Sequence, residues 1–476
     1  MKLPTSLYSE PVIRLDHSGG RSLERQLVEQ LRSAIIQGRI PPDSRLPSSR
    51  ELARECGVSR NLVVSAYDEL FVEGYIEGVH GSGTYVRRDL QSMLPDIQRR
   101  PIRTQPEATR SIEPTDVIDL RIDVGGVEPM PQTVWRQIWR GVANQIPPNR
   151  YMDPEGDYPL RAAISRYLHR ARGVRCEPEE VMITSGSQHA IDLLVRSTVG
   201  PGQVTAMEEP GYPRVRRVFI QSGATLAPIP VDADGLCVDL LPAGRRAPVL
   251  VYVTPSHQFP LGSRLSIARR LALLEWAANT GSLVVEDDYD SEFRYGAPPL
   301  PALAALDPGD SVAYVGSFSK ILSPALRIGY LVAPASTRER IREIRSLSDW
   351  HSSWPLQRAL AVFIDSGAFD TYIRRMRRLY GLKRAALARL LDEAPEVGTL
   401  RGIDAGLHAF WELAPGISAS ETAAMAAEQG VRVSTAQEFY AGVPVVSGVG
   451  MGYGAIDHAR LKYAAETLIA AARRQR

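Results

Sequence analysis

Small hydroxyl residues surround a lysine in the segment Ser317-Phe318-Ser319-Lys320, and Arg327 follows a short way along the chain. A lysine amine can form a Schiff base with an aldehyde, while hydroxyl groups and a guanidinium can hold a phosphate. This pattern indicates a site for pyridoxal 5′-phosphate (PLP), which carries both groups. A lone lysine is far more often a solvated surface residue, so other segments must supply the rest of such a site.

Three acidic residues and a tyrosine follow the apolar run 283–285, in the order Glu286, Asp287, Asp288 and Tyr289. The run has the composition of a buried strand, and carboxylates beside it are costly to bury unless they are paired or used. A carboxylate against a pyridine nitrogen keeps that nitrogen protonated and makes the ring an electron sink. The phenol could reach the oxygen on the same ring.

Two further loops have residue types that suit a flat, phosphorylated ligand. The turn Ser185-Gly186-Ser187 stands between the strand-like run 181–184 and a helical stretch. Backbone N–H groups and the helix dipole attract anions at such a place, although similar turns are also common helix caps. Tyr212 lies in the loop after the next apolar run, either as an ordinary turn aromatic or as a ring stacked on the ligand.

Strand-like runs alternate with helical stretches after residue 116, which predicts an α/β fold. The runs 204–207, 250–253 and 283–285 read as buried strands, and a loop follows each of them. Ligands bind at the carboxyl ends of the strands in open α/β sheets. The predicted fold would therefore gather the loops described above at one edge of a sheet.

The segment 23–86 has a different pattern. Helical spacing predicts a helix over 23–37, a short helix that begins at Ser48 or Ser49 and ends at Gly57, and a second helix over 60–73. A short helix, a glycine turn and a second helix form a helix-turn-helix. By itself this pattern is a weak signal, because a solvated helical subdomain with surface arginines has the same composition.

The first turn of the second helix would present Ser59, Arg60 and Asn61 to base edges and phosphates in the major groove of DNA. Two short alternating strands follow. Their tip, His80-Gly81-Ser82-Gly83, is a wing of small residues that could enter a minor groove.

Length and composition allow such a combination. The chain has 476 residues, which is too long for one compact core, so two or more domains are expected. Its formal net charge is only +2, so nucleic-acid binding would need a local basic surface. Scattered prolines and arginines over 87–114 predict an extended, basic linker. Cys56, Cys176 and Cys237 lack metal-binding spacing and are expected to be free thiols in a reducing cytosol.

The N-terminal segment resembles the winged helix of the GntR family of bacterial repressors. The resemblance covers roughly residues 20–86 and rests on Leu46-Pro47-Ser48-x-Arg50-x-Leu52-Ala53, Gly57-Val58-Ser59-Arg60 and Gly81-Ser82-Gly83-Thr84-Tyr85-Val86. It implies that DNA would be contacted by Arg50, Ser59, Arg60, Asn61, His80 and Gly81.

Roughly residues 118–470 resemble fold-type I aminotransferases, and the whole chain looks like the MocR subfamily of bacterial transcription regulators. The segments Pro-Ser-His-Gln-Phe-Pro (255–260) and Tyr-Asp-Ser-Glu-Phe (289–293) are more specific to that subfamily than to free aminotransferases. The resemblance implies that Lys320 is the Schiff-base lysine, Asp287 the partner of the pyridine nitrogen and Tyr289 the partner of the ring hydroxyl. It further implies that Tyr212 stacks on the ring. The phosphate would be held by Ser185, Gly186, Ser187, Ser317, Ser319 and Arg327, and by Tyr151 from the partner subunit.

The chain departs from the aminotransferase pattern at two positions. Phe259 stands where those enzymes carry an asparagine, so His257 or Gln258 would have to supply its hydrogen bond. Gly450 stands where they carry the arginine that pairs with the substrate carboxylate, unless another arginine such as Arg432 replaces it. Both departures weaken the case for ordinary amino-acid transamination.

The expected organisation is a winged-helix DNA-binding domain (1–87), a basic linker (88–117) and an aminotransferase-like, PLP-binding effector and dimerisation domain with large and small subdomains (118–476). The expected function is that of a cytoplasmic, homodimeric transcription regulator that senses PLP or an amine or amino-acid ligand. A working aminotransferase with a fused DNA-binding domain is the alternative. A constitutive DNA-binding protein with an inactive cofactor pocket is a third hypothesis.

Overall fold

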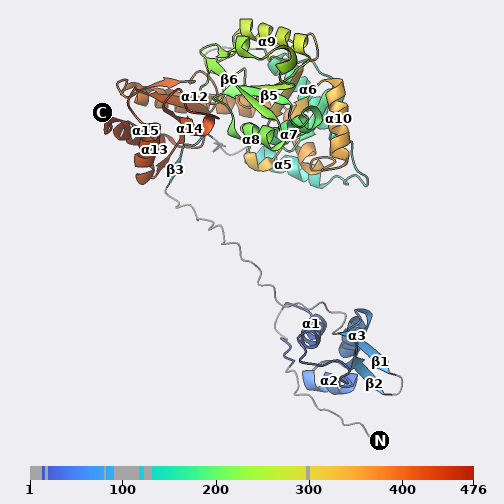
Figure 1. The fold of residues 1–476 in the computed structure, drawn as a ribbon. Helices are drawn as coiled ribbons and strands as arrows, with labels where there is room; N and C mark the ends of the chain where they lie inside the picture. Colours follow the sequence, from blue (N-terminus) through green and yellow to red (C-terminus); the bar gives the residue numbers. More distant parts are fainter. Residues whose placement is uncertain (1–12, 17–19, 80–81, 91–116, 123–130, 296–300) are drawn as a thin grey trace. The chain divides into compact units, whose positions relative to one another are not determined.

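The computed structural model describes residues 13–16, 20–79, 82–90, 117–122, 131–295 and 301–476. Contacts divide the chain into two compact units, Met1–Ile112 and Glu113–Arg476 (Figure 1). Among the described residues, no helix is both long enough and apolar enough to cross a membrane.

The described residues of the first unit form three helices and a two-stranded sheet. Its elements are α1 (Leu23–Ile36), α2 (Ser49–Cys56), α3 (Arg60–Val72), β1 (Ile76–Val79) and β2 (Gly83–Val86). One apolar cluster, which includes Leu27, Leu31, Val63 and Leu70, joins the three helices. The predicted helices and strands of this segment are confirmed, with ends that differ by a residue.

Local capping sets the turn between α2 and α3. Ser48 and Glu51 form a capping box at the start of α2. Gly57 ends α2 in the left-handed region at φ 66°, which residues with a Cβ rarely adopt. The Ser59 side chain then accepts a hydrogen bond from the Leu62 backbone N–H at 3.3 Å and starts α3. These local signals were readable in the sequence, which is why the helix-turn-helix was predictable.

The second unit is built on an eight-stranded sheet with the strand order β4-β11-β10-β9-β8-β5-β6-β7. The strands are β4 (Val181–Thr184), β5 (Val204–Glu209), β6 (Thr225–Asp232), β7 (Gly235–Leu236), β8 (Leu250–Val253), β9 (Leu283–Asp288), β10 (Val312–Ser317) and β11 (Gly329–Val332). β5, β6, β8, β9 and β10 run parallel to one another, while β11 lies antiparallel between β10 and β4.

Helices cover both faces of this sheet, which explains why its central strands β8, β9 and β10 are buried along their whole length (Figure 1). Alternate residues of β9 show the two faces: Val285 packs with α7, α8 and α10, whereas Val284 packs with α9. The helices of this part are α5 (Gln132–Ala143), α6 (Tyr158–Arg172), α7 (Ser187–Thr198), α8 (Pro213–Gln221), α9 (Ile267–Thr280), α10 (Ala335–Ser346) and α11 (Trp354–Asp365), with short 3-10 turns η1 (Pro178–Glu180), η2 (Val238–Leu240), η3 (Gly244–Arg246) and η4 (Pro324–Leu326).

The C-terminal part of this unit forms a smaller subdomain around a second sheet with the order β12-β13-β16-β15. The long helix α12 (Ala368–Asp392) precedes it. Its strands are β12 (Gly398–Arg401), β13 (His408–Leu413), β15 (Ser434–Thr435) and β16 (Gly448–Gly452), and β14 (Val431–Arg432) pairs separately with β3 (Ile118–Asp119). Helices α13 (Ala419–Glu428), α14 (Ala436–Phe439) and α15 (His458–Arg473) complete it.

One sequence-based boundary was wrong. The three acids of the segment 286–288 were expected in a loop, but β9 continues through Asp288. Acidic residues are rare in strands, which is why the prediction ended the strand early. Here the carboxylates of Glu286 and Asp288, on one face of the strand, have buried partners. Glu286 accepts a hydrogen bond from the Leu303 backbone N–H, and Asp288 pairs with Arg172, so both acids are tolerated in the strand.

Candidate cofactor pocket and DNA-binding helix

The carboxyl ends of five strands meet at one edge of the large sheet. β4, β5, β8, β9 and β10 all point the same way, because β11 is antiparallel to both of its neighbours. The last residues of these strands and the segments that follow them carry most of the residues predicted for the cofactor. Those residues are Ser185, Gly186, Ser187, Tyr212, Asp287, Tyr289, Ser317, Ser319 and Lys320.

The three acids of β9 have different surroundings. Side chains alternate along a strand, so Glu286 and Asp288 lie on one face and Asp287 on the other. Glu286 accepts hydrogen bonds from the backbone N–H groups of Leu303 and Ala304 at 2.8 and 2.9 Å. Asp288 forms a buried ion pair with Arg172, whose Nε lies 2.6 Å from its Oδ2. Two of the three carboxylates are therefore structural.

Asp287 is only half satisfied. Its Oδ2 accepts a hydrogen bond from the Tyr252 hydroxyl at 2.6 Å, whereas its buried Oδ1 has no hydrogen-bond partner among the described residues. Burial raises the pKa of this carboxyl to about 7, against the hydrogen bond from Tyr252, which lowers it. A buried acceptor of this kind suits a ligand with an N–H donor, because leaving it unpaired is costly.

Lys320 lies in a turn just after β10 and is half-buried. Its Nζ donates to the Ile122 backbone carbonyl at 3.4 Å, which holds the amine at the boundary between the large sheet and the segment after β3. Ser317 Oγ accepts a hydrogen bond from the Ser319 backbone N–H at 3.1 Å and so tightens the turn before the lysine.

An anion cradle lies at the start of α7. Gly186 precedes the helix at φ 92°, and Ser187 is its first residue. Arg327, in the left-handed region at φ 49°, donates through Nη2 to the Ser185 carbonyl at 2.9 Å. A Cβ at Gly186 would lie 3.4 Å from the Arg327 guanidinium, so the glycine lets the cation approach the helix N-terminus. Free N–H groups beside a guanidinium are the chemistry that binds a phosphate.

Aromatic side chains border the pocket. The rings of Tyr212 and Phe259 are 5.1 Å apart in an edge arrangement. The Tyr289 hydroxyl donates to the His257 carbonyl at 2.8 Å. The proposed substitutes for the missing asparagine are already used: Gln258 donates to two backbone carbonyls, and His257 bonds to Asp290. The structure therefore gives no support to the idea that either one replaces that asparagine.

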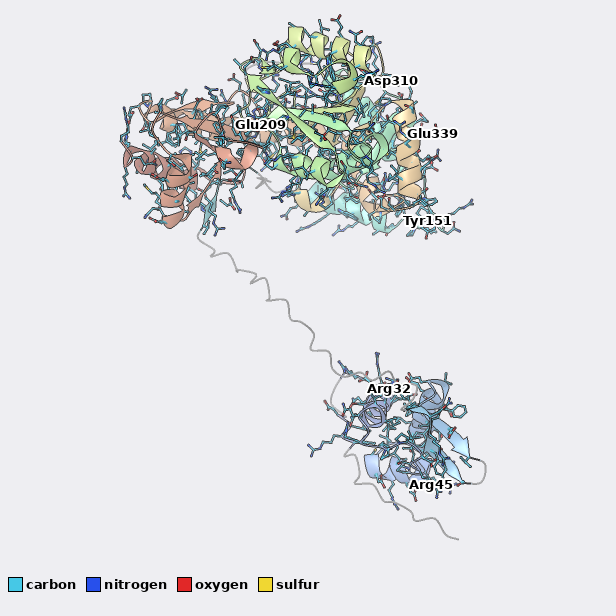
Figure 2. All side chains as sticks on the ribbon, viewed as in Figure 1. Arg32, Arg45, Tyr151, Glu209, Asp310 and Glu339 are labelled. Carbon is cyan, nitrogen blue, oxygen red and sulfur yellow. The ribbon has the colours of Figure 1, made fainter. Side chains whose placement is uncertain are left out.

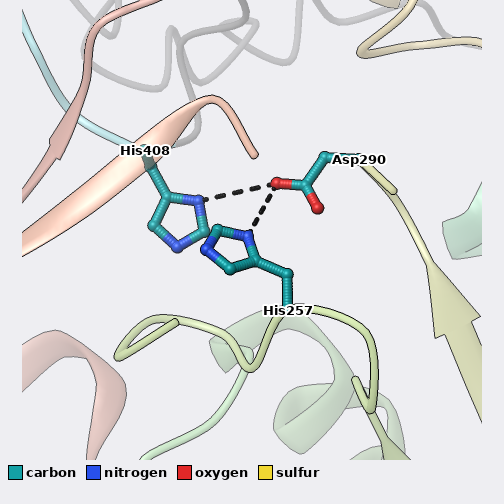
Figure 3. Close-up of side chains that lie close together, drawn as sticks. All are labelled: His257, Asp290 and His408. Atoms are coloured by element: carbon teal, nitrogen blue, oxygen red, sulfur yellow. Dashed lines mark hydrogen bonds and ion pairs between the residues drawn. The ribbon is translucent and has the colours of Figure 1, made fainter. Parts of the chain in front are cut away.

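Two histidines and a carboxylate form a buried cluster (Figure 3), and both histidine rings lie near the Tyr289 ring. His257 Nδ1 lies 2.9 Å from Asp290 Oδ2, and His408 Nδ1 lies 4.0 Å from the same oxygen. Burial alone would lower the pKa of His257, but the charge and hydrogen bond of Asp290 raise it above its ordinary value. The ion pair between His257 and Asp290 accounts for the cluster without a metal.

Tyr151 lies apart from these residues. Its side chain is 81% exposed and its ring centroid is 5.5 Å from that of Trp350 (Figure 2). Within one chain it therefore does not join the pocket, which agrees with the expectation that it acts on a partner subunit but does not test it.

Gly450 lies in β16, opposite Phe410 of β13. Arg432, the suggested replacement for an arginine at this position, lies beside Asp119 where β14 pairs with β3. Burial would raise the pKa of Asp119, but hydrogen bonds from Arg121 and the charges of Arg121 and Arg432 lower it. Arg432 is thus part of an ion cluster on β14 and β3.

The first unit presents the predicted DNA-binding residues on its surface. Arg50, Ser59, Arg60 and Asn61 are all exposed, at the starts of α2 and α3. Arg60 Nε lies 3.4 Å from Ser49 Oγ, a weak contact that leaves most of the guanidinium free for a ligand. His80 and Gly81, also predicted to contact DNA, lie outside the described residues.

Comparisons with known proteins match both units. Residues 23–86 match the family described as bacterial regulatory proteins, gntR family, and residues 126–468 match aminotransferase class I and II. The chain is 35% identical to the probable rhizopine catabolism regulatory protein MocR of Rhizobium meliloti, over 93% of this chain and 92% of that protein. The chain belongs to the MocR subfamily of GntR-type transcription regulators.

Other relatives of this MocR-type chain agree. It is 34% identical to the HTH-type pyridoxine biosynthesis transcriptional regulator PdxR of Corynebacterium glutamicum, over 93% of this chain and 94% of that one. Among solved structures it resembles a kynurenine aminotransferase of Pyrococcus horikoshii, with a TM-score of 0.71 and 27% identity over 75% of this chain and 91% of that chain. The fold of the second unit is therefore fold-type I, and the chain is a DNA-binding transcription regulator with a PLP-type domain.

The residues of this MocR-type chain fit PLP. The unpartnered Asp287 Oδ1 can accept the pyridinium N–H, and the cradle of Gly186 and Arg327 can hold the phosphate. When bound, PLP supplies an electrophilic aldehyde carbon with an electron-withdrawing ring. Lys320 would supply an amine for this carbon, and the unpartnered oxygen of Asp287 would accept the ring N–H.

Sequence reasoning missed three residues of this region. Arg172 on α6 pairs with Asp288, Tyr252 on β8 binds Asp287, and His408 on β13 lies beside Tyr289 with a ring separation of 6.0 Å. The first two stand in an ordinary basic helix and an ordinary apolar strand, and neither pattern singles them out. His408 did carry a signal, because a histidine inside an apolar strand is expensive to bury without a purpose.

Proposed function

We propose that this regulator binds PLP at Lys320 and changes its affinity for operator DNA when a ligand binds at the same site. The observation that carries the proposal is the half-satisfied Asp287, a buried carboxylate with one free oxygen at the sheet edge where Lys320 lies. A protein without a cofactor would gain stability by replacing it with an apolar residue. The carboxylate is accounted for when a bound ring nitrogen donates to it.

We propose that the regulator acts as a homodimer in the cytoplasm. Tyr151 is exposed on the second unit, and in a dimer it would reach the phosphate held by the partner's Ser185–Ser187 turn. Two chains would bring two winged helices to one operator, with each recognition helix α3 in a major groove. The spacing of the two half-sites would then depend on the shape of the dimer.

Ligand binding can act on DNA only through a difference in affinity between two shapes of the dimer. A coupling of about 1–3 kcal/mol is typical, which corresponds to a change of roughly 5- to 150-fold in operator affinity. Lys320 follows a strand of the large sheet and His408 lies in a strand of the small one, and the two are close enough for the lysine's charge to lower the pKa of His408. A ligand that touches both parts would favour one arrangement over the other.

The test is to measure operator affinity of the full-length protein with and without PLP, by fluorescence anisotropy on a DNA fragment selected by footprinting. PLP is expected to change affinity or footprint spacing in the wild-type protein and not in Lys320→Ala. Equal operator binding by both proteins in both conditions, with PLP bound by the wild type, would refute ligand control and favour the constitutive DNA-binding hypothesis.

The aminotransferase alternative has a test of its own. With Gly450 in place of the clamping arginine, position 450 offers no cation to orient an α-amino acid. We expect kcat/KM below about 10⁴ M⁻¹s⁻¹ for common amino donors and keto acids. Multiple-turnover assays with a panel of both would reveal an enzyme if any pair exceeds that value.

A further inference from the structure

The place of the missing arginine is filled by apolar side chains. A Cβ at Gly450 would lie 2.4 Å from Ile122 Cδ1 and 3.3 Å from Phe439 Cε2, so no side chain fits there unless Ile122 moves. Ile122, Phe259 and Phe439 form a buried apolar cluster, against which Tyr212 and Tyr289 pack. Position 450 therefore leaves no space for a carboxylate. It is part of an apolar surface formed by Ile122, Phe259 and Phe439, here called the apolar wall.

The strand β16 is built to accept this wall. Gly448, Gly450 and Gly452 fall on the same face of the strand, because side chains alternate. The Phe410 ring occupies the space over Gly448, where a Cβ would lie 2.4 Å from its Cε1, and Ile122 occupies the space over Gly450. On this face, Phe410 and Ile122 therefore occupy the space that side chains of β16 would otherwise fill.

This apolar wall adjoins the reactive amine. Lys320 Nζ lies 3.4 Å from the backbone oxygen of Ile122, the residue whose side chain covers Gly450. A ligand bonded at Lys320's position would therefore lie close to Ile122. A carboxylate next to the ligand's amine would be desolvated against hydrocarbon there, which is strongly unfavourable without a paired cation.

A buried histidine also lies beside this wall. His408 is 3% exposed, and its Nε2 has no hydrogen-bond partner among the described residues. Its ring centroid lies 5.5 Å from that of Phe259 and 6.0 Å from that of Tyr289. Burial lowers the pKa of His408 well below its ordinary value, and the charges of His257 and Lys320 lower it further. A hydrogen bond with the Pro260 backbone opposes this shift without reversing it. The lowered pKa favours the uncharged imidazole, which suits an uncharged or donor ligand group better than an anion.

We infer that the pocket beside Lys320 takes a primary amine whose amine-bearing carbon has no carboxylate, with its apolar body against Ile122, Phe259 and Phe439 and His408 Nε2 as its hydrogen-bond partner. This inference rests on the proposed function, because the amine must meet PLP at Lys320. In the exchange the ligand nitrogen becomes double-bonded to the aldehyde-derived carbon. Lys320 Nζ leaves as an amine, and the two hydrogens of the incoming amine pass to Nζ, so no oxidant or reductant is needed.

The test compares amines with the α-amino acids that differ from them by one carboxylate. β-Phenylethylamine against L-phenylalanine, and 3-methylbutylamine against L-leucine, are titrated into PLP-loaded full-length protein while the visible absorbance of the bound cofactor is followed. Each amine is expected to bind at least about tenfold more tightly than its amino acid, since about 1.4 kcal/mol corresponds to tenfold. Equal or tighter binding of the amino acids, or no spectral change with either amine, overturns the inference.

The starting spectrum separates the two claims. If the protein shows no visible absorbance with PLP, the proposed function has failed before the amine question is asked. If the absorbance is present and the amine preference is absent, only the inference has failed.

Two variants test the assigned residues, and the visible absorbance of bound PLP shows that each pocket is intact. His408→Ala is expected to weaken amine binding at least fivefold, with partial recovery in His408→Gln, which keeps a hydrogen-bonding side chain. The double variant Ile122→Ala with Gly450→Arg makes room for a guanidinium and is expected to reverse the preference toward L-phenylalanine. An unchanged amine affinity in His408→Ala, or an unchanged preference in the double variant, would contradict the roles of these residues.

Discussion

The two units place their functional groups in opposite settings. In the winged helix, Arg50, Arg60 and Asn61 are exposed on successive helix starts and make few contacts of their own. In the aminotransferase-like unit, Asp287 and His408 are buried, and each has one polar atom without a partner among the described residues. Exposed cations suit a DNA polyanion, because they remain hydrated until the DNA binds. Buried polar groups suit a small ligand, because only a ligand's hydrogen bond can offset the cost of burying them.

This difference predicts the sizes of mutational effects. Replacement of a buried group that contacts the ligand should nearly abolish ligand binding. Replacement of one exposed cation among several should lower DNA affinity by a limited factor. The following predictions run from the largest effect to the smallest.

Replacement of Lys320 should abolish the reaction with the cofactor. Lys320→Ala is expected to remove the visible absorbance of the PLP-loaded protein and any adduct that borohydride reduces, because no other amine of the chain is expected to take its role. Lys462→Ala is a matched control, since Lys462 is exposed on α15 and pairs with Glu466. A reducible adduct in Lys320→Ala would assign the cofactor to another lysine.

Replacement of Asp287 should weaken PLP binding strongly. Hydrogen bonds to charged groups contribute about 1.5–3 kcal/mol, so Asp287→Asn should raise the Kd for PLP about 10- to 100-fold in absorbance titrations. Thr205→Ser is a suitable control, because Thr205 is buried in β5, which β8 separates from β9, and was not assigned to the site. Affinity within twofold of wild type would show that Asp287 does not face the ring nitrogen.

The same carboxyl should leave a pH signature in the protein without PLP. Burial raises the pKa of Asp287 to about 7 in the folded state, above its unfolded value, so the folded state binds the extra proton. That contribution to stability is fully present below the unfolded pKa of 3.8 and is lost progressively as pH rises to about 7. From pH 5 to pH 8, the free energy of unfolding of wild type should fall relative to that of Asp287→Asn by on the order of 1–4 kcal/mol, as measured by thermal unfolding at each pH. A pH-independent difference would contradict the raised pKa.

Arg60 should contribute a moderate amount to operator binding. Arg60→Ala is expected to cost about 1–3 kcal/mol if the guanidinium contacts a base edge, and to weaken all DNA alike if it contacts phosphate. Arg25→Ala is the matched control, because Arg25 is an exposed arginine on α1 paired with Glu29. Unchanged affinity of Arg60→Ala for both operator and random DNA would remove α3 from the DNA interface.

Tyr151 should have the smallest effect. Tyr151→Phe removes one neutral hydroxyl, so PLP affinity should fall by a factor of a few, corresponding to about 0.5–1.5 kcal/mol. Tyr158→Phe serves as control, since Tyr158 is also exposed on the second unit. If the loss appears in the dimer and not at concentrations where the chain is monomeric, the tyrosine acts across the subunit interface; a loss in both would place its effect within one chain.

Local patterns made the winged helix predictable. Ser48, Gly57 and Ser59 set the ends of their helices through contacts three or four residues away. In the second unit, the strands and the order of the loops were also predictable, because apolar runs and turns are local. The end of β9 was not, since its acids are stabilised by Arg172, which is distant in sequence.

The character of the pocket wall could not be read from the sequence. Gly450 was recognised as a departure, but nothing local indicates that Ile122 fills its place or that His408 lies beside it. Those contacts depend on the packing of the small sheet against the segment after β3. Long-range packing of this kind has no periodicity in the chain.

The position of β11 has a consequence for the order in which the protein forms during synthesis. β4 pairs in the described sheet with β11 alone, and the contact of Arg327 with Ser185 joins residues 142 apart in the chain. The winged helix closes through short-range contacts and can fold as soon as it leaves the ribosome. The phosphate cradle must wait until β11 has been translated. A nascent chain therefore has a complete DNA-binding head well before it can sense its cofactor.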